Sequence, residues 1–174
     1  KIIKTSTLNE IIQNSDFITG PTVEKFEKSI CDYTGAEACA SIGSGTNALV
    51  CALRAVGVDE CCTVWTVGHT FVSTTEAIVN VGARPVFIDI DEYYHMDLEG
   101  IKEFNPECPP AAILFVDLYG QTPDIDKLKK FAKKHKIKLI EDAAQSFGSE
   151  YKGKKVGSLV DLTCFSFNPV KNLG

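Results

Sequence analysis

AAILFVDLYGQTPDIDKLKKFAKKHKIKLIED, residues 111–142, contains two short apolar runs separated by a lysine-rich segment. The runs at 111–117 and 137–142 have the length and the apolar character of buried strands. Between them, residues 124–136 repeat apolar side chains at helical spacing, which indicates an amphipathic helix whose lysines form a solvated face rather than a binding patch. A strand, a helix and a second strand in this order are typical of a parallel sheet.

The same alternation continues through the rest of the chain. The pattern predicts four further strands, at 38–42, 62–67, 85–90 and 162–167, and four further helices, at 22–33, 46–57, 73–82 and 96–104. A polar hairpin is expected at 149–158, with its turn at Lys152-Gly153. Six strands joined through helices by short connections predict an α/β fold, with a mainly parallel sheet covered by helices on both faces.

The composition disfavours several classes of protein. Of the 174 residues, 44% are hydrophobic, which is enough for a packed core, and the formal net charge is −5. Nucleic acids and anionic membranes attract basic proteins, so neither is expected as a partner. The longest fully apolar stretch, 111–116, is too short to cross a bilayer, and no secretory signal is expected. Seven cysteines without a C-x-x-C pair and three scattered histidines are typical of a reduced, cytoplasmic protein without a metal site.

Candidate ligand-binding residues follow the first two predicted strands, at the edge where open parallel sheets bind ligands. Gly43-Ser44-Gly45-Thr46 follows the strand at 38–42 and opens a helix. The free N–H groups and the dipole of a helix start favour an anion such as phosphate, although the same residues also suit an ordinary strand-to-helix turn. Phe71 follows the strand at 62–67, where it is either a core side chain or a ring that stacks on a ligand.

Two charged side chains follow later strands. Asp142 and Gln145 belong to the segment EDAAQ, where a carboxylate needs a positive partner or serves as a helix N-cap. Lys171 comes after the strand at 162–167 and its Ser166, and a lysine that loses hydration there can act as a nucleophilic amine. An anion site, a flat ring, a carboxylate and an amine at one edge together match pyridoxal 5′-phosphate, which carries a phosphate, a planar ring, a pyridinium nitrogen and an aldehyde that condenses with lysine.

Four segments resemble, in colinear order, the nucleotide-sugar aminotransferases of the DegT/DnrJ/StrS group, which are pyridoxal-phosphate enzymes of fold type I. They are FITGPTVEKFE (17–27), GSGTNALVCALRAVGV (43–58), VGHTFVSTTEAIVNVGARPVFIDID (67–91) and residues 118–174, in which EDAAQ (141–145) and FSFNPVKNLG (165–174) are specific to the group. The resemblance covers nearly the whole chain. It departs from the group at Val67, because a proline usually precedes the His-Thr-Phe segment.

The resemblance implies a role for each candidate residue. Lys171 is expected to form the Schiff base with the cofactor and to shuttle protons, and Asp142 is expected to pair with the pyridinium nitrogen. The remaining residues are expected to surround the cofactor: Gln145 near its phenolic oxygen, Phe71 on the face of its ring, and Ser44, Gly45, Thr46 and Ser166 around its phosphate. Relatives with histidine at the lysine position dehydrate sugars, so Lys171 favours amino transfer.

Chains of this group continue well past the lysine. Residues 1–174 are therefore expected to be the N-terminal part of a large cofactor-binding domain, without the rest of that domain or the small C-terminal domain. In the fold of the group, a later segment lies beside the first strand. The strand at 38–42 is therefore expected to lack its neighbour, and either to leave the sheet or to be covered by another chain.

The parent enzyme is expected to be a cytoplasmic homodimer of amino-sugar biosynthesis, with a link to cell-surface polysaccharide. It would take an amino group from an amino acid, glutamate in many relatives, and transfer it to a keto-sugar linked to a nucleoside diphosphate. Two alternatives stay open at this point: another pyridoxal-phosphate reaction of the same family, and a non-catalytic fragment.

Overall fold

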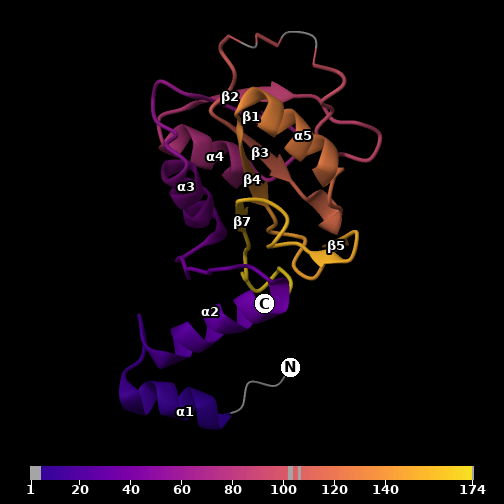
Figure 1. Ribbon diagram of the computed structural model, residues 1–174. Helices are drawn as coiled ribbons and strands as arrows, with labels where there is room; N and C mark the ends of the chain where they lie inside the picture. The colour runs from indigo at the N-terminus through magenta and orange to yellow at the C-terminus, as the bar shows by residue number, and fades with distance from the viewer. Residues whose placement is uncertain (1–4, 102–103, 106, 174) are drawn as a thin grey trace. The chain divides into compact units, whose positions relative to one another are not determined.

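The computed structural model describes residues 5–101, 104–105 and 107–173 (Figure 1). The chain divides into two compact units, one ending at Ser41 and the other beginning at Ile42. The first unit contains helices α1 (Thr5–Asn14) and α2 (Pro21–Thr34). Helix α2 confirms the helix predicted at 22–33, and Gly35 ends it in the left-handed conformation, with a φ of 81° and its N–H bonded to Cys31 O, as glycine does at many helix C-termini.

The predicted strand at 38–42 is wrong. These residues have no strand partner anywhere in the described chain, which agrees with the expectation that the segment lacks a neighbour. The backbone N–H of Ser41 instead donates to Glu27 Oε1 of α2 at 2.6 Å. A side-chain acceptor thus replaces the ladder bond that a strand would have made.

The second unit is built on five parallel strands. They are β1 (Thr63–Val67), β2 (Arg84–Ile88), β3 (Ala112–Val116), β4 (Lys138–Asp142) and β7 (Leu162–Cys164), in the sheet order β2-β1-β3-β4-β7. The parallel sheet is confirmed, with five strands in place of six. Strand β7 is shorter than the predicted 162–167, because β4 ends opposite Cys164 and Phe165 and Phe167 pack edge-on against Phe147.

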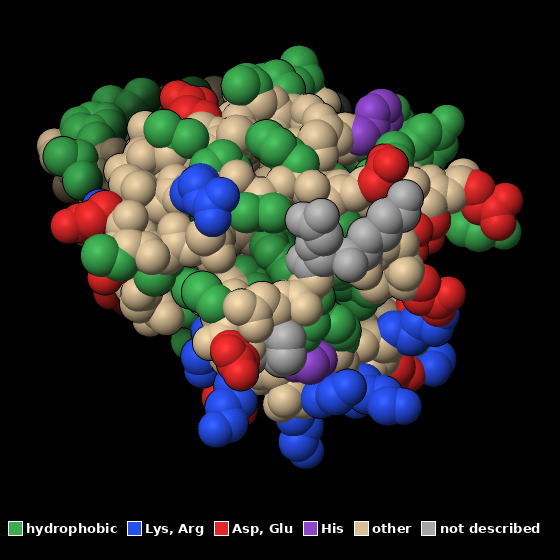
Figure 2. Space-filling view, turned by 90° about the horizontal axis from the view of Figure 1, so that it is seen from above, with side chains coloured by type: hydrophobic (Ala, Val, Ile, Leu, Met, Phe, Trp, Pro, Cys, Tyr) green, Lys and Arg blue, Asp and Glu red, His purple; other side chains and the backbone are tan. Residues whose placement is uncertain are grey.

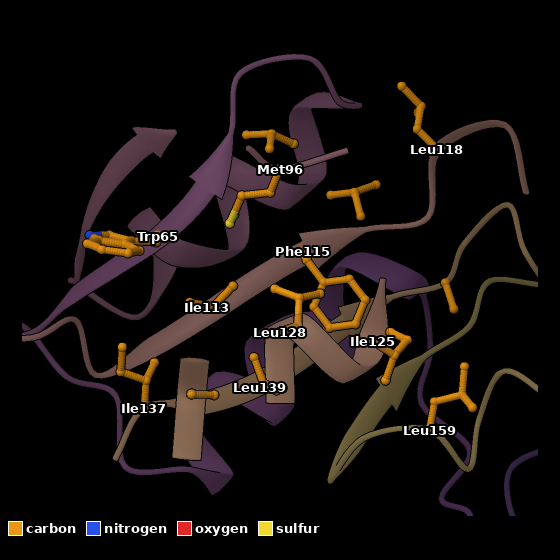
Figure 3. Close-up of a cluster of buried hydrophobic side chains, with 14 of the residues drawn as sticks. Trp65, Met96, Ile113, Phe115, Leu118, Ile125, Leu128, Ile137, Leu139 and Leu159 are labelled. Atoms are coloured by element: carbon orange, nitrogen blue, oxygen red, sulfur yellow. The ribbon is translucent and has the colours of Figure 1, made fainter. Parts of the chain in front are cut away.

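Helices cover both faces of this sheet, as predicted (Figure 1). Alternate side chains of each strand point to opposite sides. Val64, Leu114 and Ile140 pack with α3 (Gly45–Ala55) and α4 (Val72–Asn80). Trp65, Phe115 and Leu139 pack on the other side with Leu128 of α5 (Ile125–His135), as Figure 3 shows. Helix α5 joins β3 to β4, so the unit predicted from residues 111–142 is confirmed.

The lysines of α5 are solvated, as predicted. Lys127, Lys129, Lys130, Lys133 and Lys134 are all exposed. Figure 2 shows lysine and arginine side chains gathered along one edge of the face seen from above, projecting outward. Among the described residues, no helix is long and apolar enough to cross a membrane.

Two local predictions have different outcomes. The hairpin at 149–158 is confirmed as β5 (Glu150–Tyr151) paired antiparallel with β6 (Lys154–Lys155). The helix predicted at 96–104 is wrong over its described residues; 102 and 103 lie outside them. Asp97 accepts from the N–H groups of Glu99 and Gly100 at 3.0 Å each, which forms a local turn in place of a helix. Between β3 and α5 lies the short 3₁₀ helix η1 (Leu118–Gly120).

Candidate active site

The carboxyl ends of the strands bring most of the predicted site residues to one edge of the sheet. Strand β1 lies between β2 and β3 in the sheet. After β1 the chain adds β2 on one side of β1, and it then crosses over to add β3 on the opposite side. Such a reversal opens a crevice at the strand ends, where doubly wound α/β proteins bind ligands. Phe71 follows β1, Asp142 is the last residue of β4 and Lys171 follows β7, so all three lie at this edge.

The start of α3 forms the first part of the site. Ser44 is its N-cap, and Ser44 Oγ accepts from the backbone N–H of Asn47 at 3.1 Å. A Cβ placed on Gly45 would lie 3.0 Å from Ser166 Cβ, so the helix start and the loop after β7 approach each other closely. Thr46 Oγ1 donates to Ser73 Oγ of α4 at 2.9 Å. The structure therefore gathers the predicted Ser44, Gly45, Thr46 and Ser166 at the start of a helix, a setting that favours an anion.

Asp142 forms the second part of the site. Its side chain is 6% exposed; Oδ2 accepts from Thr74 Oγ1 at 2.8 Å, and Oδ1 accepts from the N–H of Ala144 at 3.3 Å. Burial raises the pKa of Asp142, while these two hydrogen bonds and the charge of Lys171 oppose the rise. Residues 143–149 form turns and no helix, so the alternative interpretation of Asp142 as a helix N-cap is wrong.

Phe71 and Lys171 form the third part of the site. The Lys171 amine lies 6.0 Å from the centroid of the Phe71 ring. The phenylalanine is 65% exposed, so it is not the core side chain that its sequence position also allowed. The backbone N–H of Lys171 donates to Asn168 O at 2.7 Å, which fixes the turn that presents the lysine. An amine and an open aromatic ring thus meet at the edge that carries Asp142.

Gln145 is held by the loop after β3. Its Oε1 accepts from the backbone N–H of Tyr119 at 2.9 Å. Tyr119 has a φ of 60°, a conformation that is unusual for a residue other than glycine and that is often found at ligand sites. The amide of Gln145 therefore joins the strand ends of β3 and β4.

Thr70, Thr74 and His69 also lie at this edge, and the sequence did not indicate a role for them. Thr74 Oγ1 donates to Asp142, and Thr70 Oγ1 lies 2.9 Å from Thr74 Oγ1. His69 stacks on Tyr94 with ring centroids 5.2 Å apart, and its Nε2 lies 3.2 Å from the Tyr119 hydroxyl. A hollow of about 440 Å³ opens beside His69, between Gly68 and the end of β2. The contact between Thr70 and Thr74 could have been expected from the sequence, because residues four positions apart lie on the same face of a helix.

The fold and this edge together define a parallel α/β protein whose strand ends carry an amine, an exposed aromatic ring and a buried carboxylate. The chain belongs to the DegT/DnrJ/EryC1/StrS aminotransferase family, whose family model matches residues 3–174. It is 40% identical over 169 residues to the UDP-2-acetamido-2-deoxy-3-oxo-D-glucuronate aminotransferase of Pseudomonas aeruginosa, covering 96% of this chain and 46% of that protein.

Solved structures give the same result for the fold. A DegT DnrJ EryC1 StrS aminotransferase from Brucella abortus superposes with a TM-score of 0.92 at 31% identity, over 98% of this chain and 48% of that one. NtdA from Bacillus subtilis, solved with the bound cofactor PMP, gives a TM-score of 0.89 at 32% identity, over 97% of this chain and 38% of that one. The chain spans just under half the length of the curated relatives that it matches.

Proposed function

We propose that the protein to which this chain belongs is a pyridoxal-phosphate-dependent aminotransferase. In this proposal it takes an amino group from an amino acid, with glutamate as the donor, and delivers it to a keto-sugar linked to a nucleoside diphosphate. The observation that carries the proposal is the meeting of the Lys171 amine with the exposed Phe71 ring, 6.0 Å from its centroid, at the edge that holds the buried Asp142. Membership of the aminotransferase family and the similarity to the UDP-sugar aminotransferase of Pseudomonas aeruginosa support it.

The residues present fit pyridoxal phosphate. The start of α3 has the dipole that favours an anion. Gly45 has no side chain, and a Cβ at this position would lie only 3.0 Å from Ser166 in the loop after β7, so the backbone there stays open to a ligand. We propose that Ser44, Gly45, Thr46 and Ser166 hold the phosphate there. Phe71 would cover one face of the ring, Gln145 would lie near its oxygen substituent, and the buried Asp142 carboxylate would pair with its nitrogen.

The amine of Lys171 is the group that binds the cofactor covalently and moves protons. When bound, the cofactor supplies an electron sink that stabilises negative charge on the substrate carbon. Lys171 Nζ, as a neutral amine, accepts a proton from that carbon and returns it as an ammonium. Asp142 keeps the ring nitrogen protonated, because a cation beside a buried carboxylate removes much of the cost of its burial.

The wider assembly is also part of the proposal. We propose that residues 1–174 are the first part of the large cofactor-binding domain of a cytoplasmic homodimer that serves amino-sugar synthesis for cell-surface polysaccharide. Large apolar side chains of the first unit support a covering partner: Leu8, Ile12, Phe17 and Ile18 are 49–88% exposed. Burying such side chains against a second copy would remove apolar surface from water.

The proposal is tested with the whole protein supplied with pyridoxal phosphate, glutamate and a keto-sugar linked to UDP. Amination of the sugar and formation of 2-oxoglutarate in equal amounts are expected. Glutamate consumption without an aminated sugar would point to the alternative, another pyridoxal-phosphate reaction of the family. Cofactor binding with no turnover for any keto-sugar nucleotide would contradict the proposed activity.

A further inference from the structure

Two carboxyl groups are fully buried on the side of the sheet opposite Asp142. Asp117, the residue after β3, and Glu141, on β4, are both 0% exposed. Because alternate residues of a strand face opposite sides, Glu141 shares the α5 side with Leu139, while Asp142 faces α4 and bonds to its Thr74. Glu141 and Asp142 are adjacent in sequence, but they lie on different faces of the sheet.

The hydrogen bonds of this pair leave one oxygen open on each carboxyl group. Asp117 Oδ2 accepts from Ser146 Oγ at 2.9 Å and from Thr122 Oγ1 at 3.2 Å. Glu141 Oε2 accepts from Thr163 Oγ1 at 2.7 Å. Among the described residues, no hydrogen-bond partner is found for the buried Asp117 Oδ1 or for the buried Glu141 Oε1. The charge of Glu141 raises the pKa of Asp117, so the two carboxyl groups are near neighbours, and a proton shared between them would satisfy these oxygens.

Two carboxylates cannot both stay charged in this setting, since burial and mutual repulsion oppose it. Asp117 and Glu141 repel each other when both are charged, and the charge of Lys129 of α5 lowers the pKa of Glu141. A single proton between the groups converts the repulsion into a charge-assisted hydrogen bond. Burial, followed by the charge of Glu141, raises the pKa of Asp117 to about 8, and burial also raises the pKa of Glu141, so both shifts favour a proton on the pair at neutral pH.

Asp117 is also connected to the cofactor side of the sheet. Its backbone N–H donates to the carbonyl oxygen of Asp142 at 3.1 Å. Its side chain holds Ser146, the neighbour of Gln145, and Gln145 in turn binds the N–H of Tyr119 two residues beyond Asp117. The loops 117–120 and 142–146 are thus joined through Asp117.

We propose that Asp117 is a positioning residue of the cofactor site: a neutral carboxylic acid that donates its proton to the Glu141 carboxylate and so holds loops 117–120 and 142–146 in place. The proton sharing stands independently of the proposed function, whereas its consequence for the cofactor rests on that function. Above about pH 8, loss of the proton sets two buried carboxylates against each other and loosens both loops.

The proton is observed directly by infrared spectroscopy of the whole protein. A carbonyl band of a protonated carboxyl group is expected at pH 7, and it should disappear as the pH passes about 8. Asp117→Asn, which keeps a neutral donor of the same shape, should lack the band. Glu141→Gln should lose it at a lower pH than the wild type, because an amide that donates to Asp117 favours the charged form. Asp126→Asn, at an exposed position of α5, should leave the band unchanged.

The consequence for the site is measured as the dissociation constant of pyridoxal phosphate from pH 7 to pH 9. At pH 9, about one unit above the pKa of Asp117, about a tenth of the molecules keep the Asp117 proton. If only the protonated form holds the two loops in place, the affinity of the wild type should be about tenfold lower at pH 9 than at pH 7. The affinity of Asp117→Asn should not show this fall between pH 7 and pH 9, whereas that of Asp126→Asn should fall as in the wild type. A band that persists in Asp117→Asn, or an equal fall in affinity in that variant, would overturn the proposal. Failure of the proposed function would instead appear as no cofactor binding at any pH, with the infrared result intact.

Discussion

The hydrogen bond from Thr74 to Asp142 offers a sharp test of how the cofactor carboxylate is controlled. Thr74 is fully buried and donates to Asp142 Oδ2 at 2.8 Å. Thr74→Val keeps the shape of the side chain but removes the donor. A hydrogen bond to a charged group contributes about 1.5–3 kcal/mol, which corresponds to a roughly ten- to hundredfold change in the proton affinity of Asp142.

The sign follows from the chemistry of Asp142. Burial already raises the pKa of Asp142 and the Thr74 hydrogen bond opposes that rise, so its loss raises the pKa further. In the proposed mechanism the active form of Asp142 is the carboxylate, so the variant should lose activity at a higher pH than the wild type as the solution is acidified. The acid limb of kcat/KM against pH in the whole enzyme should move upward by about one to two on the pH scale.

Thr70→Val is the matched control. Thr70 bonds to Thr74 at 2.9 Å, so this variant disturbs the same pair of threonines but leaves the donor to Asp142 in place. Its acid limb should remain near the wild-type position. An unchanged acid limb in Thr74→Val, or an equal movement in Thr70→Val, would refute the reasoning.

The remaining predictions concern the other parts of the site. Lys171→Ala should abolish the covalent cofactor adduct trapped by borohydride, whereas Lys152→Ala, at an exposed position of the β5–β6 hairpin, should retain it; a labelled peptide that contains another lysine would contradict the assignment. Asp142→Asn should leave phosphate binding largely intact but lower turnover by several powers of ten, each worth about 1.4 kcal/mol in the barrier; near-normal turnover would remove Asp142 from the mechanism. Gly45→Ala places a Cβ 3.0 Å from Ser166, whereas Gly43→Ala meets nothing closer than 3.9 Å; cofactor titration should show a weakened affinity in the first variant only. Because the pKa of Asp117 is raised from 3.8 to about 8, the stability that its neutral form contributes is fully present below about pH 4 and is lost as the pH rises to about 8, so Tm should fall across that window and the fall should flatten in Asp117→Asn.

Periodicity was sufficient for the parts of the fold where local and tertiary preferences agree. Residues 111–142 contain complete apolar runs, and the structure forms β3, α5 and β4 there. The two wrong elements are places where a side chain competes with the backbone ladder. Asp97 accepts from the N–H groups of Glu99 and Gly100, which forms a local turn where a helix was predicted. Glu27 accepts from the N–H of Ser41, which lies in the segment predicted to be a strand.

The site shows the same division. Lys171 and Asp142 could be placed at one edge because they lie at or after the ends of β7 and β4, and strand ends converge in a parallel sheet. The start of α3 was placed there from a preceding strand that the structure does not form. Thr74 could not be assigned its role, since its partner Asp142 lies 68 positions away in the chain. The contact between Asp117 and Glu141 likewise depends on the pairing of β3 with β4, whose register places Val116 opposite Asp142.

Because Glu141 and Asp142 lie on opposite faces of β4, the sheet separates the electrostatic environments of these two carboxyl groups. On one side, beneath α5, Glu141 accepts the proposed hydrogen bond from the protonated Asp117; on the other side, Asp142, the neighbour of Glu141 in the chain, faces the proposed cofactor site. Protein engineers can therefore retune the electrostatics of such an enzyme from the rear, by exchanging residues that no substrate touches. Inherited variation beneath α5 would likewise alter the working pH of the enzyme while every residue in contact with its ligands stayed the same.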